Sequence, residues 1–240
     1  MLAQWLQTSK YTVVLTGAGM STESGLPDFR SAQTGLWNQK NPQQLASTYA
    51  LKHNRDEFIA FYQYRIRTLQ QCEPHTGHIL LAEWEKRGMV QNIVTQNVDG
   101  FHQQAGSKNV IELHGSLRTV HCQRCHKAYA SDMYINEEFY CTCGGFLRPS
   151  VVLFGEALPS DAIEKAWLAA QKAELLIVLG SSLQVSPANQ LPLIAKRNGA
   201  KLVIVNMEPT ELDEWADLVI HHRKIGEILK EIDSELKAGE

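Results

Sequence analysis

The first stretch with residues suited to chemistry is a glycine-rich loop directly after an apolar segment. Residues 17–19 (GAG) follow residues 11–16 (YTVVLT), and Thr22 comes three residues later. Glycines at this place let backbone N–H groups approach a phosphate, with the N-terminus of the next helix aimed at it. The dehydrogenase fingerprint, however, needs a glycine where Thr22 stands and an acid about 20 residues on, and residues 31–54 contain none. The pattern therefore indicates either a nucleotide site of a different kind or a tight turn between a strand and a helix.

Two other segments contain groups that could complete a nucleotide site. Asn206 and Glu208 lie just past an apolar segment, where ligands collect in open α/β sheets, and they could hold a ribose in place of the missing acid. Asp28, Phe29 and Arg30 add a carboxylate, an aromatic ring and a guanidinium. Phe29 could shield a reactive centre and Arg30 could pair with a phosphate, although a loop in which Arg30 pairs with Asp28 fits as well.

Polar residues follow three further apolar segments. Residues 96–99 (QNVD) carry amides that donate and accept hydrogen bonds and a carboxylate that accepts them. Residues 180–182 (GSS) could bind phosphate through N–H and O–H groups, or could cap a helix. His114 stands between an apolar segment and a glycine, and its reference pKa suits a general base. Each group by itself also fits a turn, a cap or a surface histidine.

Four of the five cysteines are clustered between residues 122 and 143. The spacing C-x-x-C, then C-x-C followed by two glycines, indicates four thiolates around a structural, tetrahedral zinc ion, and a redox pair is the less favoured alternative. The ligands would be Cys122, Cys125, Cys141 and Cys143. The second pair is one residue short of the usual spacing, so His121 or His126 could replace Cys141 as the fourth ligand. Cys72 stands apart, and we expect it to be a small buried side chain.

The apolar segments indicate which elements position these groups. Segments rich in Val, Ile and Leu without polar alternation are typical of parallel strands covered on both faces. They lie at residues 11–16, 92–97, 175–180, 202–206 and 218–222. Helical patterns lie between several of them, at residues 76–87 and 161–172, the second with Trp167 on its buried face. A last helical pattern follows at residues 226–237. Alternating strands and helices predict an α/β fold with a doubly wound, Rossmann-like parallel sheet.

Two stretches interrupt this alternation and are predicted as insertions. Residues 32–72 turn helical only in their second half, and residues 118–150 hold the four clustered cysteines with little periodicity. We expect a helical insertion and a small zinc-ribbon module that pack near each other, together forming a small domain. The Rossmann-like domain would then comprise residues 1–31, 73–117 and 151–240.

Composition excludes several classes of protein. Hydrophobic residues make up 44% and charged residues 20%, as in ordinary globular domains, which excludes a disordered chain, a coiled coil and a collagen-like repeat. The net charge is −3, which argues against a general nucleic-acid binder. Apolar runs are too short to span a membrane, and the first residues lack the order of a signal peptide. We expect a cytoplasmic protein, most simply a monomer, without nucleic-acid or membrane partners.

Seven motifs, in one order, resemble those of bacterial-type sirtuins, which are NAD-dependent protein-lysine deacylases. The resemblance runs from Val13 to Ile228, and the C-x-C pair is the main departure from it. The motifs are GAGMSTESGLPDFR (17–30), TQNVD (95–99), HG (114–115), the paired cysteines, RPSVVLFGE (148–156), GSSLQVSPA (180–188) and VNMEPT (205–210).

The resemblance implies NAD as a co-substrate, one structural zinc ion and a set of site residues. His114 would be the catalytic base, with Asn97 beside it in the catalytic centre. NAD would be bound by Gly17, Ala18, Gly19, Thr22, Asp28, Phe29, Arg30, Gln96, Asn97, Val98, Asp99, Gly180, Ser181, Ser182, Asn206, Glu208 and Ile225.

The resemblance also implies the reaction and its partners. The acyl oxygen of an acyl-lysine protein attacks the anomeric carbon of NAD as nicotinamide leaves. His114 then takes a proton from a ribose hydroxyl, which attacks the acyl carbon. The products are free lysine, nicotinamide and O-acyl-ADP-ribose. The segment Val152, Leu153, Phe154, Gly155 and Glu156 resembles the one that pairs with the substrate peptide as an added strand.

A Tyr-x-x-Arg pattern bears on the acyl group. Class III members of the family, which remove succinyl and malonyl groups, carry such a pair, and Tyr62 and Arg65 match it. These residues share one helix face, and a phenol with a guanidinium can bind a terminal carboxylate. Ala46 matches a small residue that widens the acyl pocket of that class. Alternatively, Arg65 only meets solvent or Glu57, and the enzyme is a plain deacetylase.

Two other functions remain open on the sequence. Mono-ADP-ribosyl transfer would use the same cleavage of NAD with a side chain as acceptor. A nucleotide-sensing module would bind NAD without turnover, which the His114 and Asn97 pair argues against.

Overall fold

A six-stranded parallel sheet forms the centre of the larger part of the protein. The computed structural model describes residues 1–31, 35–38 and 41–239. Among these residues, the sheet has the order β3-β2-β1-β7-β8-β9, and every neighbouring pair is parallel. Its strands are β1 (Thr12–Thr16), β2 (Asn92–Thr95), β3 (Val110–Glu112), β7 (Leu175–Leu179), β8 (Lys201–Val205) and β9 (Leu218–Ile220). The predicted Rossmann-like sheet is therefore confirmed.

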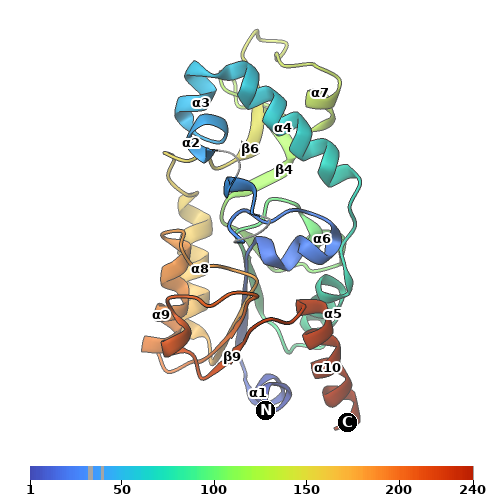
Figure 1. Cartoon of the computed structure of the whole chain (residues 1–240), viewed down its shortest axis with the longest axis vertical. Coiled ribbons are helices and arrows are strands. Elements are labelled where there is room, and N and C mark those ends of the chain that lie inside the picture. Colours follow the sequence, from blue (N-terminus) through green and yellow to red (C-terminus); the bar gives the residue numbers. More distant parts are fainter. Residues whose placement is uncertain (32–34, 39–40, 240) are drawn as a thin grey trace.

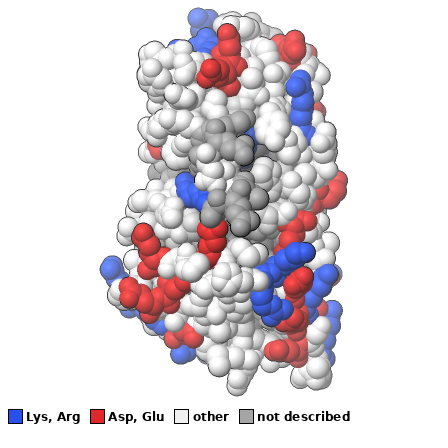
Figure 2. Space-filling view, in the orientation of Figure 1, with Lys and Arg blue, Asp and Glu red and all other residues white. Residues whose placement is uncertain are grey.

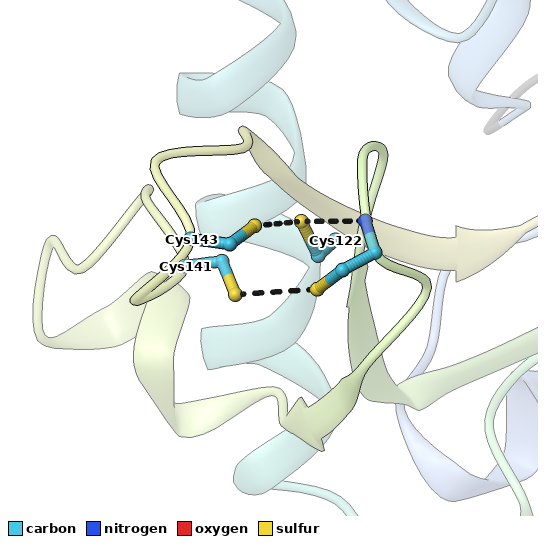
Figure 3. A group of neighbouring side chains, drawn as sticks. Cys122, Cys141 and Cys143 are labelled. Carbon is cyan, nitrogen blue, oxygen red and sulfur yellow. Dashed lines mark hydrogen bonds between the residues drawn. The ribbon is translucent and has the colours of Figure 1, made fainter.

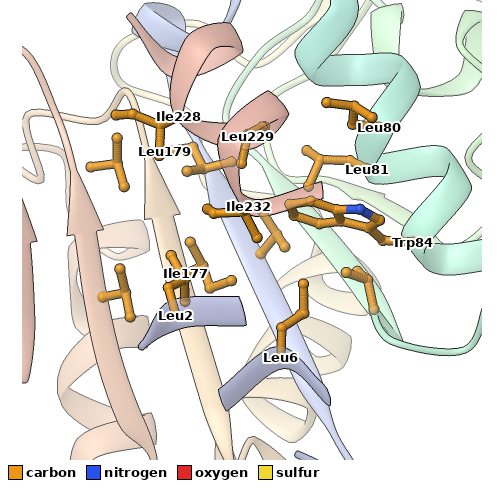
Figure 4. Close-up of a cluster of buried hydrophobic side chains, with 14 of the residues drawn as sticks. Leu2, Leu6, Leu80, Leu81, Trp84, Ile177, Leu179, Ile228, Leu229 and Ile232 are labelled. Carbon is orange, nitrogen blue, oxygen red and sulfur yellow. The ribbon is translucent and has the colours of Figure 1, made fainter. Parts of the chain in front are cut away.

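Helices cover both faces of this sheet because alternate residues of each buried strand point to opposite faces. On one face, Val14 and Ile177 pack with helices α1 (Leu2–Thr8), α5 (Thr76–Lys86) and α10 (Ile225–Ala238). On the other face, Val13 and Leu176 pack with α8 (Ser160–Lys172) and α9 (Leu191–Arg197). Figure 1 shows these two layers on either side of the strands, and Figure 4 shows Trp84 of α5 among the side chains of the first layer.

The second helix layer corrects one prediction. Trp167 of α8 is 41% exposed, whereas Ala166, Ala169 and Ala170 are buried. The helix approaches the sheet through these small alanines, which leaves the adjacent tryptophan ring at the margin of the contact.

The two predicted insertions pack together above the sheet (Figure 1). An antiparallel sheet of order β5-β4-β6 contains β4 (Gly115–Cys122), β5 (Ala128–Ala130) and β6 (Leu147–Val151). Phe58 and Ile66 of α4 (Arg55–Gln70) share one buried cluster with Val120 of β4 and Leu147 of β6. Three short helices complete this part: α2 (Pro42–Leu45), α3 (Thr48–His53) and α7 (Asp132–Ile135).

The remaining short elements lie in loops that follow strands. They are the helix α6 (Phe101–Gln104) and the 3-10 helices η1 (Ala18–Ser24), η2 (Leu36–Asn38), η3 (Ala188–Gln190) and η4 (Asp213–Trp215). In the described part of the chain, the helices are all too short or too polar to cross a membrane. Figure 2 shows acidic and basic side chains interspersed on the face of the protein that is turned to the viewer in Figure 1.

The burial of the first layer predicts a contrast between two leucine substitutions. Leu81→Ala removes a fully buried side chain of α5, whereas Leu168→Ala removes one that is 48% exposed on α8. We expect Leu81→Ala to lower the free energy of unfolding by about 2–5 kcal/mol, through lost burial and a cavity. Leu168→Ala should change it by less than about 0.5 kcal/mol. Urea denaturation of both variants measures this, and similar losses would contradict the assigned core.

Candidate active site

One cavity of about 940 Å³ lies at the carboxyl ends of the parallel strands, between the large sheet and the elements packed with the small antiparallel sheet. The residues that the sequence analysis assigned to catalysis, to NAD and to the acyl-lysine substrate all line it. They come from segments far apart in the chain, including the loops after β1, β2, β7 and β8. The sequence thus predicted residues that the fold does bring together.

The loops after β1 and β7 touch each other through their backbones. Gly17 N–H donates to Leu179 O at 3.1 Å, and Gly19 N–H donates to Gly180 O at 2.9 Å. A Cβ atom on Gly17 would lie 2.7 Å from Gly180 O, and Gly180 has a φ of +62° that favours glycine. The glycines are thus required for this close approach. The loop continues as the seven-residue 3-10 helix η1 rather than the α-helix that the dinucleotide pattern predicts.

A chain of hydrogen bonds joins the loop after β2 to the glycine loop. The amide of Asn97 donates to Gly17 O at 2.9 Å and to Ser21 Oγ at 3.1 Å. Ser21 in turn donates to Asp99 Oδ2 at 2.7 Å, and burial raises the pKa of Asp99. Gln96 donates to Ser181 Oγ at 2.9 Å. Ser21 was missed by the sequence analysis, since a serine in a polar loop carries no distinguishing signal.

A second set of hydrogen bonds, between buried threonines and a histidine, connects to the first set through Asn97. Thr16 Oγ1 lies 2.8 Å from Thr95 Oγ1 and 3.0 Å from His102 Nε2. Thr95 Oγ1 also accepts the backbone N–H of Asn97 at 3.0 Å. All three side chains are at most 3% exposed. Sequence reasoning treated Thr16 as an ordinary strand residue and Thr95 as one of the polar groups at a strand end. The pairing of the two becomes visible only in the register of β1 with β2.

His114 is oriented so that it can act as a base. Its Nδ1 lies 2.9 Å from the carbonyl oxygen of Gln96, which can only accept, so Nδ1 carries the proton and Nε2 is the basic nitrogen. Burial lowers the pKa of His114, and the nearby Arg30 contributes in the same direction. His114 is therefore neutral at neutral pH, as a proton acceptor must be.

The loop at residues 28–31 is organised by Asp28. Its carboxylate accepts the backbone N–H groups of Arg30 and Ser31, at 3.1 and 2.9 Å, and the hydroxyl of Ser31 at 2.6 Å. Arg30 thus contacts Asp28 through its backbone N–H, which differs from the side-chain ion pair considered from the sequence. Arg30 lines the cavity, and burial lowers the pKa of its guanidinium.

The Tyr-x-x-Arg pair lies on the cavity side of α4. Tyr62 is 2% exposed, and burial raises its pKa to about 12, so the phenol keeps its proton and can donate. The guanidinium carbon of Arg65 lies 5.0 Å from the ring centre of Phe29 and 5.9 Å from that of Phe61. Ala46 is buried at the same end of the cavity. The guanidinium of Arg65 is thus held over the Phe29 and Phe61 rings at the cavity wall.

Residues 152–156, which were predicted to pair with the substrate, are held by backbone hydrogen bonds to the segment at Ala46 and Thr48. Phe154 donates its N–H to Ala46 O at 2.9 Å, and its carbonyl accepts the Thr48 N–H at 3.0 Å. Glu156 accepts two hydrogen bonds from the buried Arg148, at 2.6 and 3.0 Å, and one from Leu153 N at 2.8 Å. The Glu156 carboxylate therefore shapes this segment by binding Arg148.

The opposite end of the cavity contains the groups predicted for a ribose. Asn206 donates its amide to Glu208 O at 2.7 Å, which closes a turn directly after β8. Ile225, the first residue of α10, is 6% exposed and lines the same end. Sequence reasoning did not select His222, Arg223 and Lys224, which precede it in the lining.

The four clustered cysteines form a separate site beside the small antiparallel sheet, at the end of β4. Their Sγ atoms all lie within 4.8 Å of one another, and Cys122–Cys143 and Cys125–Cys141 are 3.5 and 3.6 Å apart (Figure 3). Four thiolates at a Zn–S distance of about 2.3 Å would be about 3.8 Å apart, so the group fits a tetrahedral zinc ion. The Cys143 N–H lowers the pKa of Cys141 to about 6, which favours the thiolate.

This geometry settles the question about Cys141. Cys141 belongs to the group despite the short C-x-C spacing, whereas His121 contacts Ser150 Oγ at 3.1 Å. The described residues that line the large cavity do not include these cysteines, which fits a structural role for the zinc ion. Cys72 is half-buried rather than buried as expected.

Comparison with known proteins identifies the family. The family described as "Sir2 family" matches residues 17–187. The chain belongs to the Sir2 family. Relatives include the "NAD-dependent protein deacetylase 1" of Geobacillus kaustophilus, which is 70% identical over 98% of this chain and 97% of its own length. The "NAD-dependent protein deacetylase" of Oceanobacillus iheyensis is 60% identical, over 98% of this chain and 100% of its own length.

Solved structures of Sir2 proteins share the whole fold. A Sir2 structure with a p53 peptide and NAD+ superimposes with a TM-score of 0.90 at 39% identity, over 99% of this chain and 98% of that one. Another, with a deacetylated p53 peptide and 3'-O-acetyl ADP ribose, gives a TM-score of 0.92 at 40% identity, over 98% and 96%. The resemblance of the motifs to the sirtuins is thereby confirmed.

The cysteine geometry predicts one zinc ion in this Sir2 family chain. We expect one equivalent of zinc per chain in the purified protein and in Cys72→Ser, the matched control outside the cluster. Cys143→Ser should lose the metal and melt at a lower temperature, because metal binding contributes to folding. Elemental analysis and thermal melting measure this. A full equivalent of zinc in Cys143→Ser would contradict the ligand set.

Proposed function

We propose that the protein is an NAD-dependent protein-lysine deacetylase. The orientation of His114 carries this proposal: Nδ1 is fixed by the Gln96 carbonyl, and the neutral ring lies in the wall of the large cavity. A general base in a cavity that is also lined by Asn97 and the glycine loop suits removal of a proton from a bound ribose. The names of the relatives agree with this activity.

The lining of the cavity fits NAD from end to end. The contact of Gly17 with Gly180 leaves room for a phosphate at the strand ends, and Asn206 with Glu208 would hold the adenosine ribose. Gln96, Asn97 and Asp99 would hold the nicotinamide ribose and carboxamide. NAD supplies an ADP-ribosyl group whose anomeric carbon accepts the acyl oxygen as nicotinamide leaves.

The chain's own residues then direct the acyl transfer. Residues 152–156 lie in the wall of the cavity, and a peptide added alongside this segment would bring the acyl-lysine next to His114. Nε2 of His114 takes the proton of a ribose hydroxyl, which attacks the acyl carbon. Phe29 in the cavity wall would exclude water from the reacting centre.

We further propose that the enzyme accepts acyl groups that end in a carboxylate, such as succinyl and malonyl, in addition to acetyl. Arg65 contributes a half-buried guanidinium at the acyl end, and Tyr62 adds a phenol that keeps its proton. A buried cation is stabilised by an anion that it can bind with charge-assisted hydrogen bonds. Ala46 leaves space for the longer chain.

The reaction itself is tested with His114→Ala. We expect the wild-type protein with NAD and an acetyl-lysine peptide to release nicotinamide and form O-acetyl-ADP-ribose, as followed by mass spectrometry. His114→Ala should lower this product roughly 100-fold or more, because a positioned base contributes about 10²–10⁴ in rate. Labelled ADP-ribose appearing on protein instead of acyl transfer would favour ADP-ribosylation, and failure of the wild type to release nicotinamide would exclude turnover.

The acyl preference is tested with two arginine substitutions on the same helix. Arg65→Met should lower kcat/KM for a succinyl-lysine peptide roughly 10- to 100-fold, the loss expected for charge-assisted hydrogen bonds, and should spare an acetyl-lysine peptide. Arg67→Met, at an exposed position of α4, is the control and should leave both unchanged. Equal losses on both peptides in Arg65→Met would show that Arg65 does not bind the carboxylate of the succinyl group.

A further inference from the structure

His221 joins the two loops that form the adenosine end of the cavity. It follows β9 and directly precedes His222, Arg223, Lys224 and Ile225, which line that end. Its Nδ1 lies 2.9 Å from the carbonyl oxygen of Asn206 in the loop after β8. Its Nε2 lies 2.8 Å from Asp213 Oδ2 in η4. One imidazole ring therefore connects both lining loops to η4.

Both partners of this ring are acceptors only. A backbone carbonyl has no proton to donate, and an ionised carboxylate has none either. Asp213 is ionised: burial alone would raise its pKa, but hydrogen bonds from Thr210 and His221 outweigh burial and lower it. A neutral imidazole has one N–H, so either tautomer would leave a lone pair facing an oxygen at less than 3 Å. Only the imidazolium form satisfies both contacts.

The charged groups around the ring agree with this state. Burial alone would lower the pKa of His221, but the hydrogen bonds to Asn206 O and to Asp213 outweigh it and raise the pKa above 6.5. Thr210 contributes its N–H and hydroxyl to Asp213, at 3.0 and 2.6 Å, and so holds the carboxylate in place. The neighbouring His222 ring is 6.0 Å away, and Arg223 is paired with Glu231.

We propose that His221 is a positioning residue for the adenosine end of the NAD site, and that its imidazolium form holds the Asn206–Glu208 turn in the binding arrangement. Loss of the proton turns one hydrogen bond into a repulsive contact and releases the turn or η4. NAD affinity then falls as pH rises through the pKa of His221, and NAD binding takes up a proton. This inference rests on the proposed use of NAD.

Calorimetric titration with NAD tests it without relying on turnover. Between pH 6 and pH 9 the Kd should rise about 3- to 10-fold with a midpoint above pH 6.5, which corresponds to a coupling of up to about one pKa unit. Titrations near the midpoint in buffers of different ionisation enthalpy should show net proton uptake. Burial lowers the pKa of His114, so its titration lies on the acid side of the midpoint expected for His221.

Two variants test whether the pH dependence of NAD binding comes from His221 and Asp213. His221→Gln should bind NAD with a Kd that no longer depends on pH in this range and without proton uptake. Asp213→Asn should move the midpoint to lower pH, because the carboxylate that favours the imidazolium is gone. Asp213 lies outside the lining, so a structural loss alone would weaken binding at every pH and leave the midpoint unchanged.

The outcomes separate this inference from the proposed function. A flat Kd for wild type, or unchanged proton uptake in His221→Gln, would overturn the role of His221 while leaving the deacetylase proposal intact. No binding of NAD at any pH would overturn both.

Discussion

The backbones of two loops meet at the carboxyl ends of β1 and β7, and the geometry of the cavity depends on this contact. Cβ atoms on Gly17 and Gly19 would lie 2.7 and 2.8 Å from atoms of Gly180. Any side chain there would push the loops apart and shift Asn97, whose amide is fixed on Gly17 O. Main-chain contacts between the two loops therefore set this part of the cavity wall, and residues larger than glycine do not fit there.

Rigidity in this region comes from buried polar groups that bind one another. Thr16, Thr95 and His102 form one set, and Asn97 connects it to Ser21. Burial lowers the pKa of His102 to about 3, so this support stays neutral. Hydrogen bonds among buried groups in a low-dielectric interior fix the arrangement of their members, although Nδ1 of His102 has no hydrogen-bond partner among the described residues. Neutral hydrogen bonds thus fix the loops around the cavity, while charged side chains such as Arg65 lie at the cavity wall.

The sequence predicted most of the large sheet and most of the cavity, because both depend on local signals. Unbroken apolar segments mark β1, β7 and β8, and the motifs lie directly after them. The small sheet was not predicted, since β5 has two exposed residues and one half-buried residue, and β4 pairs across a register shift. Thr16 with His102, and His221 with Asp213, could not be found either. Their chemistry depends on contacts between segments that only the fold brings together.

The two ends of the cavity carry positive charge in different ways. Arg65 is held over the Phe29 ring, and although burial lowers its pKa, a guanidinium stays protonated in any accessible pH range. His221 is charged only below a pKa that a carboxylate and a carbonyl hold above 6.5. Recognition of an acyl carboxylate would therefore be constant across physiological pH, whereas affinity for the co-substrate would vary. A single chain can in this way keep its choice of acyl group fixed while its saturation with NAD responds to the proton concentration.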